Sequence, residues 1–83
     1  MRTFKLLIIS TDEAIFDGEA QCCRIVTDSG SIGFEAMHEP MITVLKKNTD
    51  IHVRDAEGKS RLIPVVEGIL SFKDNACSIT VSI

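Results

Sequence analysis

Hydrophobic and polar residues alternate with a period of two along most of the chain. The last segment shows this most clearly, because Ile79, Val81 and Ile83 alternate with serine and threonine. Successive side chains of a β-strand point to opposite faces, so the pattern predicts strands with one face in a core and the other in water. No segment of useful length shows a helical period.

The same pattern divides the chain into short strands separated by turn residues. We expect strands at residues 4–9, 14–16, 19–27, 31–34, 41–46, 51–54, 59–66, 69–72 and 76–83. Turn signals lie between them at Asp17-Gly18, Asn48-Thr49, Asp55–Gly58 and Lys73–Asn75. Pro64 has no backbone N–H to donate, which predicts an edge strand or a bulge. About eight to ten short strands without a helix predict one all-β domain over residues 1–83, a sandwich or a barrel.

One interval, Thr27–Thr43, interrupts the alternation. It contains Gly30, Gly33 and Pro40, which shape loops because glycine admits a positive φ and proline lacks a backbone donor. The interval also holds three large apolar side chains: Phe34, Met37 and Met41. A loop on a rigid β scaffold is a frequent place for recognition, so the sequence predicts a binding surface here.

Charge and composition exclude several classes of function. The formal net charge of −3 argues against general nucleic-acid binding, which depends on a positive surface. Contents of 45% hydrophobic and 25% charged residues are those of a globular domain. No apolar run approaches the roughly 20 residues of a membrane helix, and the short run Leu6–Ile9 does not make a signal peptide. We therefore expect a cytoplasmic protein.

Candidate catalytic and metal-binding residues are few. His38 beside Glu39 offers a base with a carboxylate, and Cys22 and Cys23 offer thiols. Adjacent residues rarely point at a common centre, however, and the cysteines lack the paired spacing of zinc sites. In a strand Cys22 and Cys23 point to opposite faces, which predicts free thiols rather than a disulfide. The sequence therefore predicts no enzyme, no metal and no cofactor.

Three motifs in order resemble the N-terminal β-sandwich domain of the epsilon subunit of F-type ATP synthases, called delta in mitochondria. The motifs are Phe16-Asp17-Gly18, then Gly30-x-Ile32-Gly33-Phe34 continuing to His38-x-Pro40-Met41, and finally Gly68-Ile69-Leu70. The chain departs from the family pattern at Ala36-Met37, which replaces Pro-Gly, and at Glu67, which replaces the first Gly of a Gly-Gly pair. The resemblance extends from Phe4 to Ile83.

The resemblance implies a two-sheet antiparallel β-sandwich with a non-catalytic role. The chain would be a central-stalk subunit of a proton- or sodium-translocating F-type ATP synthase, linking the gamma subunit to the loops of the c-ring and coupling rotation to ATP synthesis. The residues facing the c-ring would be Ser31, Phe34, His38 and Met41, and the structural turn residues would be Gly18, Gly30, Gly33, Pro40 and Gly68. The protein would lie on the inner face of the energy-transducing membrane, as a peripheral part of the complex. It would lack the C-terminal helices with which family members inhibit ATP hydrolysis.

A second hypothesis is a stand-alone β-sandwich that binds a small ligand or peptide through the interval Gly30–Met41. The two hypotheses predict different surfaces. A stalk subunit needs an exposed apolar patch larger than monomers normally show, whereas a ligand-binding module needs a concave pocket with converging polar groups.

Overall fold

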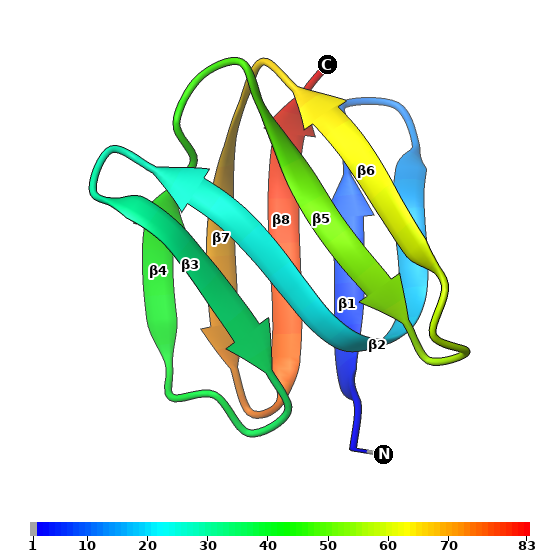
Figure 1. The fold of residues 1–83 in the computed structure, drawn as a ribbon. Coiled ribbons are helices and arrows are strands. Elements are labelled where there is room, and N and C mark those ends of the chain that lie inside the picture. Colours follow the sequence, from blue (N-terminus) through cyan, green and yellow to red (C-terminus); the bar gives the residue numbers. More distant parts are fainter. Residues whose placement is uncertain (1) are drawn as a thin grey trace.

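The computed structural model describes residues 2–83, and its regular structure consists of eight strands (Figure 1). Their bounds are β1 Phe4–Ile9, β2 Ala14–Thr27, β3 Gly30–Glu35, β4 Met41–Val44, β5 Thr49–Asp55, β6 Ser60–Val65, β7 Glu67–Lys73 and β8 Ala76–Ser82. Among the described residues no helix is long and apolar enough to cross a membrane.

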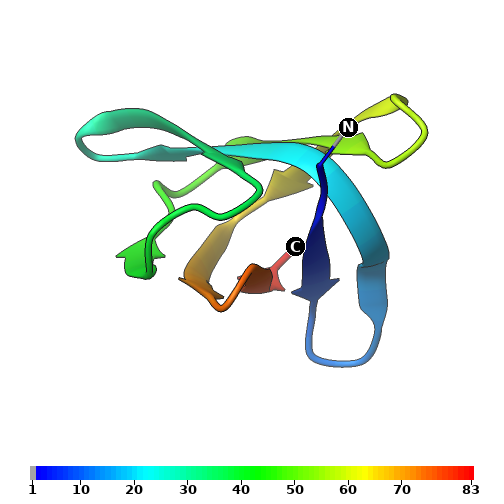
Figure 2. The ribbon, with the colours of Figure 1, turned by 90° about the horizontal axis from the view of Figure 1, so that it is seen from below.

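The strands form two packed layers, and β2 takes part in both (Figure 2). In one layer, which we call sheet I, the order is β4-β7-β8-β1, followed by the first half of β2. The other layer, sheet II, contains β3, the second half of β2, β5 and β6. The register of β2 shifts between Ala20 and Cys22, and such a bulge lets a strand bend from one layer into the other. The predicted β-sandwich is therefore confirmed.

Two details of the strand pattern differ from the sequence prediction. The expected turn at Asp17-Gly18 is wrong, because β2 continues through both residues and Gly18 lies opposite Leu6 of β1. One strand pair also departs from the antiparallel arrangement, because β1 and β8 run parallel. The first and last strands of the described chain thus lie side by side within sheet I.

Alternate residues of both sheets point into one shared core. Its aromatic centre consists of Phe4, Phe34 and Phe72, which are 0–1% exposed. The Phe72 ring centroid lies 5.4 Å from that of Phe4 and 5.8 Å from that of Phe34. Phe34 belongs to sheet II and the other two rings belong to sheet I, so this cluster joins the layers. Aromatic pairs at such distances add to the stabilisation that burial provides.

Several predicted turns and the predicted edge position are confirmed. Asp74 and Asn75 connect β7 to β8 with φ values of 52° and 58°, the positive φ at both positions that a tight hairpin prefers. Asn48 and Gly58 also adopt positive φ, in the connections before β5 and before β6. Pro64 lies in β6, which forms an edge of sheet II.

Candidate interaction surface

The outer face of sheet I carries a group of exposed apolar side chains. Ile42 and Val44 of β4 are 76% and 64% exposed, and Ile69 of β7 is 54% exposed. Leu7 and Ile9 of β1 are half-buried on the same face, because the alternate residues of β1 point into the core. We call these five residues the apolar face.

The strand register aligns the apolar face in two rows that cross the sheet. The first row reads Val44, Ile69, Thr80 and Ile9, and the second reads Ile42, Ser71, Ser78 and Leu7. Residues directly opposite each other on neighbouring strands have Cβ atoms about 5 Å apart, so each row forms a continuous surface. None of these eight side chains is charged, and the second row continues on β2 with the exposed Asp17 opposite Leu7.

A shallow groove of about 580 Å³ follows the first row and is lined by Ile9, Val44, Ile69 and Thr80, among others. Glu67 also lines this groove, so a partner that covers the two rows must leave its carboxylate in water or pair it, because burial of an unpaired charge is costly. Covering apolar area releases about 25 cal/mol for each Å². Contiguous exposed apolar surface of this kind marks protein–protein contact.

The connection between β3 and β4, residues 36–40, is held firmly at one end of the sandwich. The Met37 N–H donates to Oδ1 of Asn75 at 2.7 Å, and Nδ2 of Asn75 donates to the Thr3 carbonyl at 3.1 Å. The His38 ring lies on the core, with its centroid 4.6 Å from that of Phe34. Met37 is 64% exposed and has a φ of 67°. This connection therefore presents Met37 on a fixed backbone.

The structure separates the four residues that the resemblance groups as one c-ring interface. Ser31 is exposed near the turn between β2 and β3, whereas His38 lies beyond the other end of β3. Ser31 and Glu35 are four residues apart in β3, and at a rise of roughly 3.3 Å per residue they lie about 13 Å apart along the strand. Met41 is half-buried against the core. Phe34 is completely buried, so its assignment to a surface is wrong and its ring instead supports His38 from below.

Three of the five predicted turn residues lie inside strands, and the turn prediction is wrong for Gly18, Gly33 and Gly68. Gly68 allows β7 and β8 to approach closely, since a Cβ there would lie 3.0 Å from the Thr80 carbonyl oxygen. A Cβ at Gly33 would meet nothing within 4 Å. Gly30 has a φ of 120° as the first residue of β3, and Pro40 lies in the connection before β4.

The cysteines point to opposite faces of β2, as predicted. Cys23 is buried in the core together with Cys77, whereas Cys22 is half-buried on the outer face of sheet II. Burial raises the pKa of the Cys77 thiol from 9.0 to about 12. Burial, followed by the nearby Cys77 and Cys22 thiols, raises the pKa of Cys23 well above its ordinary value. Both core thiols are therefore neutral and unreactive at physiological pH.

Residues 2–83 contain no group of three or more His, Cys, Asp or Glu side chains that could hold a metal.

The sequence contains a signal for the apolar face that the expectation of a binding loop at Thr27–Thr43 does not include. In the segment Met41–Leu45 the outward positions Ile42 and Val44 are as apolar as the inward ones. A strand that is apolar on both faces is typical of a strand covered on both sides. Ile69 opposite Val44 repeats the signal on β7.

A β-sandwich whose outer face carries two apolar rows has the surface of a structural domain that binds other proteins. The family model described as "ATP synthase, Delta/Epsilon chain, beta-sandwich domain" matches residues 3–83. The chain therefore belongs to the family of ATP synthase delta/epsilon chains, of which it contains the β-sandwich domain.

Relatives and solved structures agree with this assignment. An ATP synthase epsilon chain of Delftia acidovorans is 30% identical over 79 residues, covering 95% of this chain and 56% of that protein. One from Streptomyces avermitilis is 30% identical over 76 residues, covering 92% of this chain and 60% of that protein. The chain thus spans little more than half the length of these relatives.

The fold matches a chain in the structure of the Euglena gracilis mitochondrial ATP synthase OSCP/F1/c-ring. The TM-score is 0.87 at 22% identity, and the match covers 95% of this chain and 50% of the other. A chain from the Tetrahymena thermophila mitochondrial ATP synthase central stalk and c-ring gives a TM-score of 0.81 at 17% identity, covering 99% and 65%. At these identities the likeness concerns the fold.

Proposed function

We propose that this domain is a non-catalytic part of the central stalk of an F-type ATP synthase. There it connects the gamma subunit with the c-ring and helps to couple ring rotation, driven by protons or sodium ions, to ATP synthesis. The observation that carries the proposal is the apolar face of sheet I in a chain of the delta/epsilon family. A part that turns with a rotor needs a lasting contact, and lasting interfaces are more apolar than transient ones.

The apolar face is the proposed contact with gamma. Its two rows run across four strands of one sheet, so a partner meets a surface whose shape is set by the sheet's hydrogen bonds. Charged residues such as Glu67 and Lys73 lie near its margins, at the two ends of β7. An apolar centre with a polar rim is the usual arrangement of a protein–protein interface.

The connection at residues 36–40 is the proposed contact with the c-ring loops. Its support is the hydrogen bonding through Asn75 and the packing of His38 on Phe34, which fix the backbone that carries Met37. Ser31 forms a second contact point at the opposite end of β3. The protein would then be peripheral, on the inner face of the energy-transducing membrane, through its place in the complex.

The alternative of a ligand-binding loop at Gly30–Met41 has less support. Residues 30–35 of this interval are the regular strand β3, and only residues 36–40 form a connection. The connection is closed by its own hydrogen bonds and by the His38 packing, which leaves little of it free to enclose a peptide.

Co-purification with the gamma subunit and c-ring of the source cell tests the proposal. The Val44→Lys, Ile69→Lys variant places two charges in the apolar face, and we expect it to lose capture of gamma. Leu62→Lys is the matched control, because Leu62 is 65% exposed on β6 in the other sheet. Both variants should fold, since lysine is well tolerated at exposed strand positions.

Unchanged capture of gamma by the double variant, or equal loss in the Leu62 control, would contradict the gamma contact. A separate His38→Ala, Met37→Ser variant should retain gamma but weaken retention of the c-ring. If ring retention is unchanged, the ring-facing end lies elsewhere, and the corresponding variant at Ser31 identifies it.

A further inference from the structure

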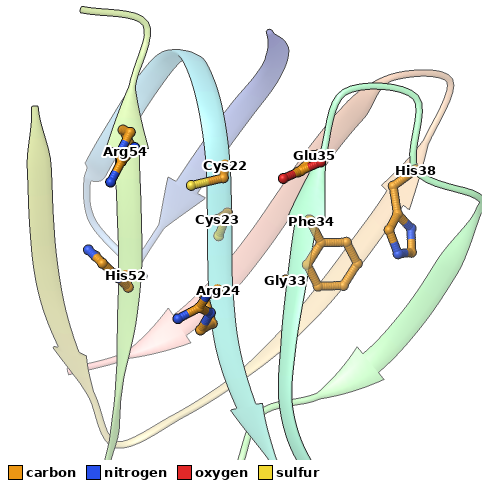
Figure 3. Close-up of a pocket in the computed structure, with 9 residues that line it drawn as sticks. All are labelled: Cys22, Cys23, Arg24, Gly33, Phe34, Glu35, His38, His52 and Arg54. Carbon is orange, nitrogen blue, oxygen red and sulfur yellow. The ribbon is translucent and has the colours of Figure 1, made fainter. Parts of the chain in front are cut away.

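The outer face of sheet II brings two arginines and a histidine close together, in a chain with a formal net charge of −3. Arg24 extends from β2, and His52 and Arg54 extend from the neighbouring β5, all on the side of the sheet away from the core (Figure 3). Their chain neighbours Cys23, Ile51 and Val53 point inward and are completely buried. The cluster therefore has a rigid base.

The register brings these three side chains together. Arg24 lies opposite His52, and Cys22 lies opposite Arg54, so the two arginines are diagonal neighbours across the β2–β5 pair. Diagonal neighbours are roughly 7–8 Å apart, a distance that two arginine side chains span with ease. Both guanidinium groups can thus reach one ligand placed between them.

The donors of this cluster are free. The side-chain hydrogen bonds within residues 2–83 use neither Arg24, nor His52, nor Arg54. Each guanidinium has five N–H donors in a planar fork. Glu35 of β3 and Asp50 of β5 are acidic residues on the same face. Glu35 lies opposite Cys22 and is separated by that strand from Arg54, and Asp50 lies two residues from His52 along β5, so both carboxylates are diagonal neighbours of Arg24.

A depression of about 340 Å³ lies at the cluster, and its lining includes Cys22, Arg24, Gly33, Glu35, His52 and Arg54. Gly33 of β3 lies opposite Arg24 of β2 and contributes no side chain. A Cβ at this position would meet nothing within 4 Å and the φ is not positive, so neither packing nor backbone requires glycine there. The missing side chain keeps the β3 side of the depression open.

We propose that this depression binds a phosphate group between Arg24 and Arg54, with His52 beside it. Phosphate is favoured because a guanidinium fork binds its oxygens through two parallel hydrogen bonds, and two forks satisfy several oxygens at once. The size of the depression suits inorganic phosphate or the phosphate of a small ester. The site lies on the opposite side of the sandwich from the apolar face, so it does not depend on the stalk function.

Titration of the 83-residue chain with inorganic phosphate, followed by amide chemical shifts, tests the proposal. Chloride keeps the ionic strength constant, because screening alone changes the behaviour of surface charges. We expect saturable shifts at residues 22–24, 33 and 52–54. A parallel titration with glycerol phosphate distinguishes the free ion from an ester: binding of both assigns recognition to the phosphate group, and binding of the ester alone assigns the site to an ester.

Three variants make the test specific. Arg24→Gln, Arg54→Gln should weaken binding by on the order of tenfold or more, as loss of charge-assisted hydrogen bonds does. Lys46→Gln, Lys47→Gln removes the same charge from another exposed part of the chain and should leave binding unchanged. Glu35→Gln should strengthen binding, because it removes the nearby negative charge.

Cys22 provides a second readout within the depression. Bound phosphate should slow alkylation of Cys22 by uncharged N-ethylmaleimide in the wild type but not in the arginine variant. The buried Cys23 and Cys77 should not react in the folded protein. Absence of saturation in the wild type by either phosphate compound, or equal weakening in the arginine and lysine variants, would overturn the proposal.

Discussion

The two outer faces of this sandwich have opposite chemistry over one shared core. Sheet I presents two rows of apolar and hydroxyl side chains without a charge, whereas sheet II presents Arg24, His52, Arg54 and Glu35. The inner faces are alike, since both contribute completely buried aliphatic and aromatic residues. Positions that alternate along the same strands thus differ in role: the inner set forms the core, and the outer set gives each sheet its surface chemistry.

The largest effect on stability should come from the aromatic cluster that joins the sheets. Phe72→Ala removes the ring that contacts both Phe4 and Phe34, and we expect it to lower the free energy of unfolding by about 3–5 kcal/mol. Urea denaturation measures this loss, and Phe72→Leu should lose less. A change below about 1 kcal/mol in Phe72→Ala would show that the two layers are not held together at this point.

Alkaline pH should lower the stability of the fold through the buried thiols and not through the outer thiol of Cys22. A folded-state pKa of about 12 for Cys77, raised from 9.0, favours the folded state fully below pH 9, and this contribution is lost as pH rises from 9 to about 12. The loss approaches about 1.4 kcal/mol per pH unit for each such thiol, because the unfolded chain ionises first. Denaturation midpoints between pH 8 and pH 11 should show a smaller decline in Cys77→Ala, and an unaltered decline in Cys22→Ser.

A methyl group added under the apolar face should destabilise the fold by a smaller amount. In Gly68→Ala the new Cβ meets the Thr80 carbonyl oxygen and the Val81 side chain at 3.0 Å, which forces β7 and β8 apart. We expect a loss of about 1–3 kcal/mol, typical of overpacking. Thermal unfolding measures it, and a wild-type midpoint would mean that the two strands separate without strain.

The corresponding change on sheet II should have the smallest effect. In Gly33→Ala the Cβ enters open space at an ordinary φ, so the folded state is not strained. The unfolded state, in contrast, loses backbone conformational entropy. The expected result is a gain of roughly 0.4–1 kcal/mol. Destabilisation in the same thermal assay would show that the depression beside Arg24 is tighter than the structure indicates.

The strands of this fold were largely predictable from the sequence because most inner positions carry a recognisable side chain. The predicted strand at residues 76–83 corresponds to β8, and that at 4–9 is β1. The prediction failed at Gly18, Gly33 and Gly68, because a glycine has no side chain to show which face it occupies. The short strand expected at residues 31–34 corresponds to β3, Gly30–Glu35, in which Ile32 and Phe34 point toward the core.

The interaction surfaces were less predictable, because they depend on which strands become neighbours. Val44 and Ile69 form one row only because β4 pairs with β7, which lies more than twenty residues further along the chain. The arginine cluster likewise depends on the pairing of β2 with β5. The family resemblance places Phe34 at an interface, but the register turns it inward. Family resemblance identified the domain, whereas strand pairing determines its surfaces.

The parallel pairing of β1 with β8 has a mechanical consequence. The chain enters sheet I at the start of β1 and leaves it at the end of β8, and these two points lie at opposite ends of the molecule (Figure 1). Tension applied between the termini therefore acts along the two strands and loads the ladder from Lys5–Ala76 to Ile9–Thr80 in shear. All bonds of that ladder must yield together, whereas a hairpin pulled open from its end yields one bond at a time. When the domain is pulled by its termini in an optical trap, we expect one abrupt unfolding event at high force and no gradual unzipping.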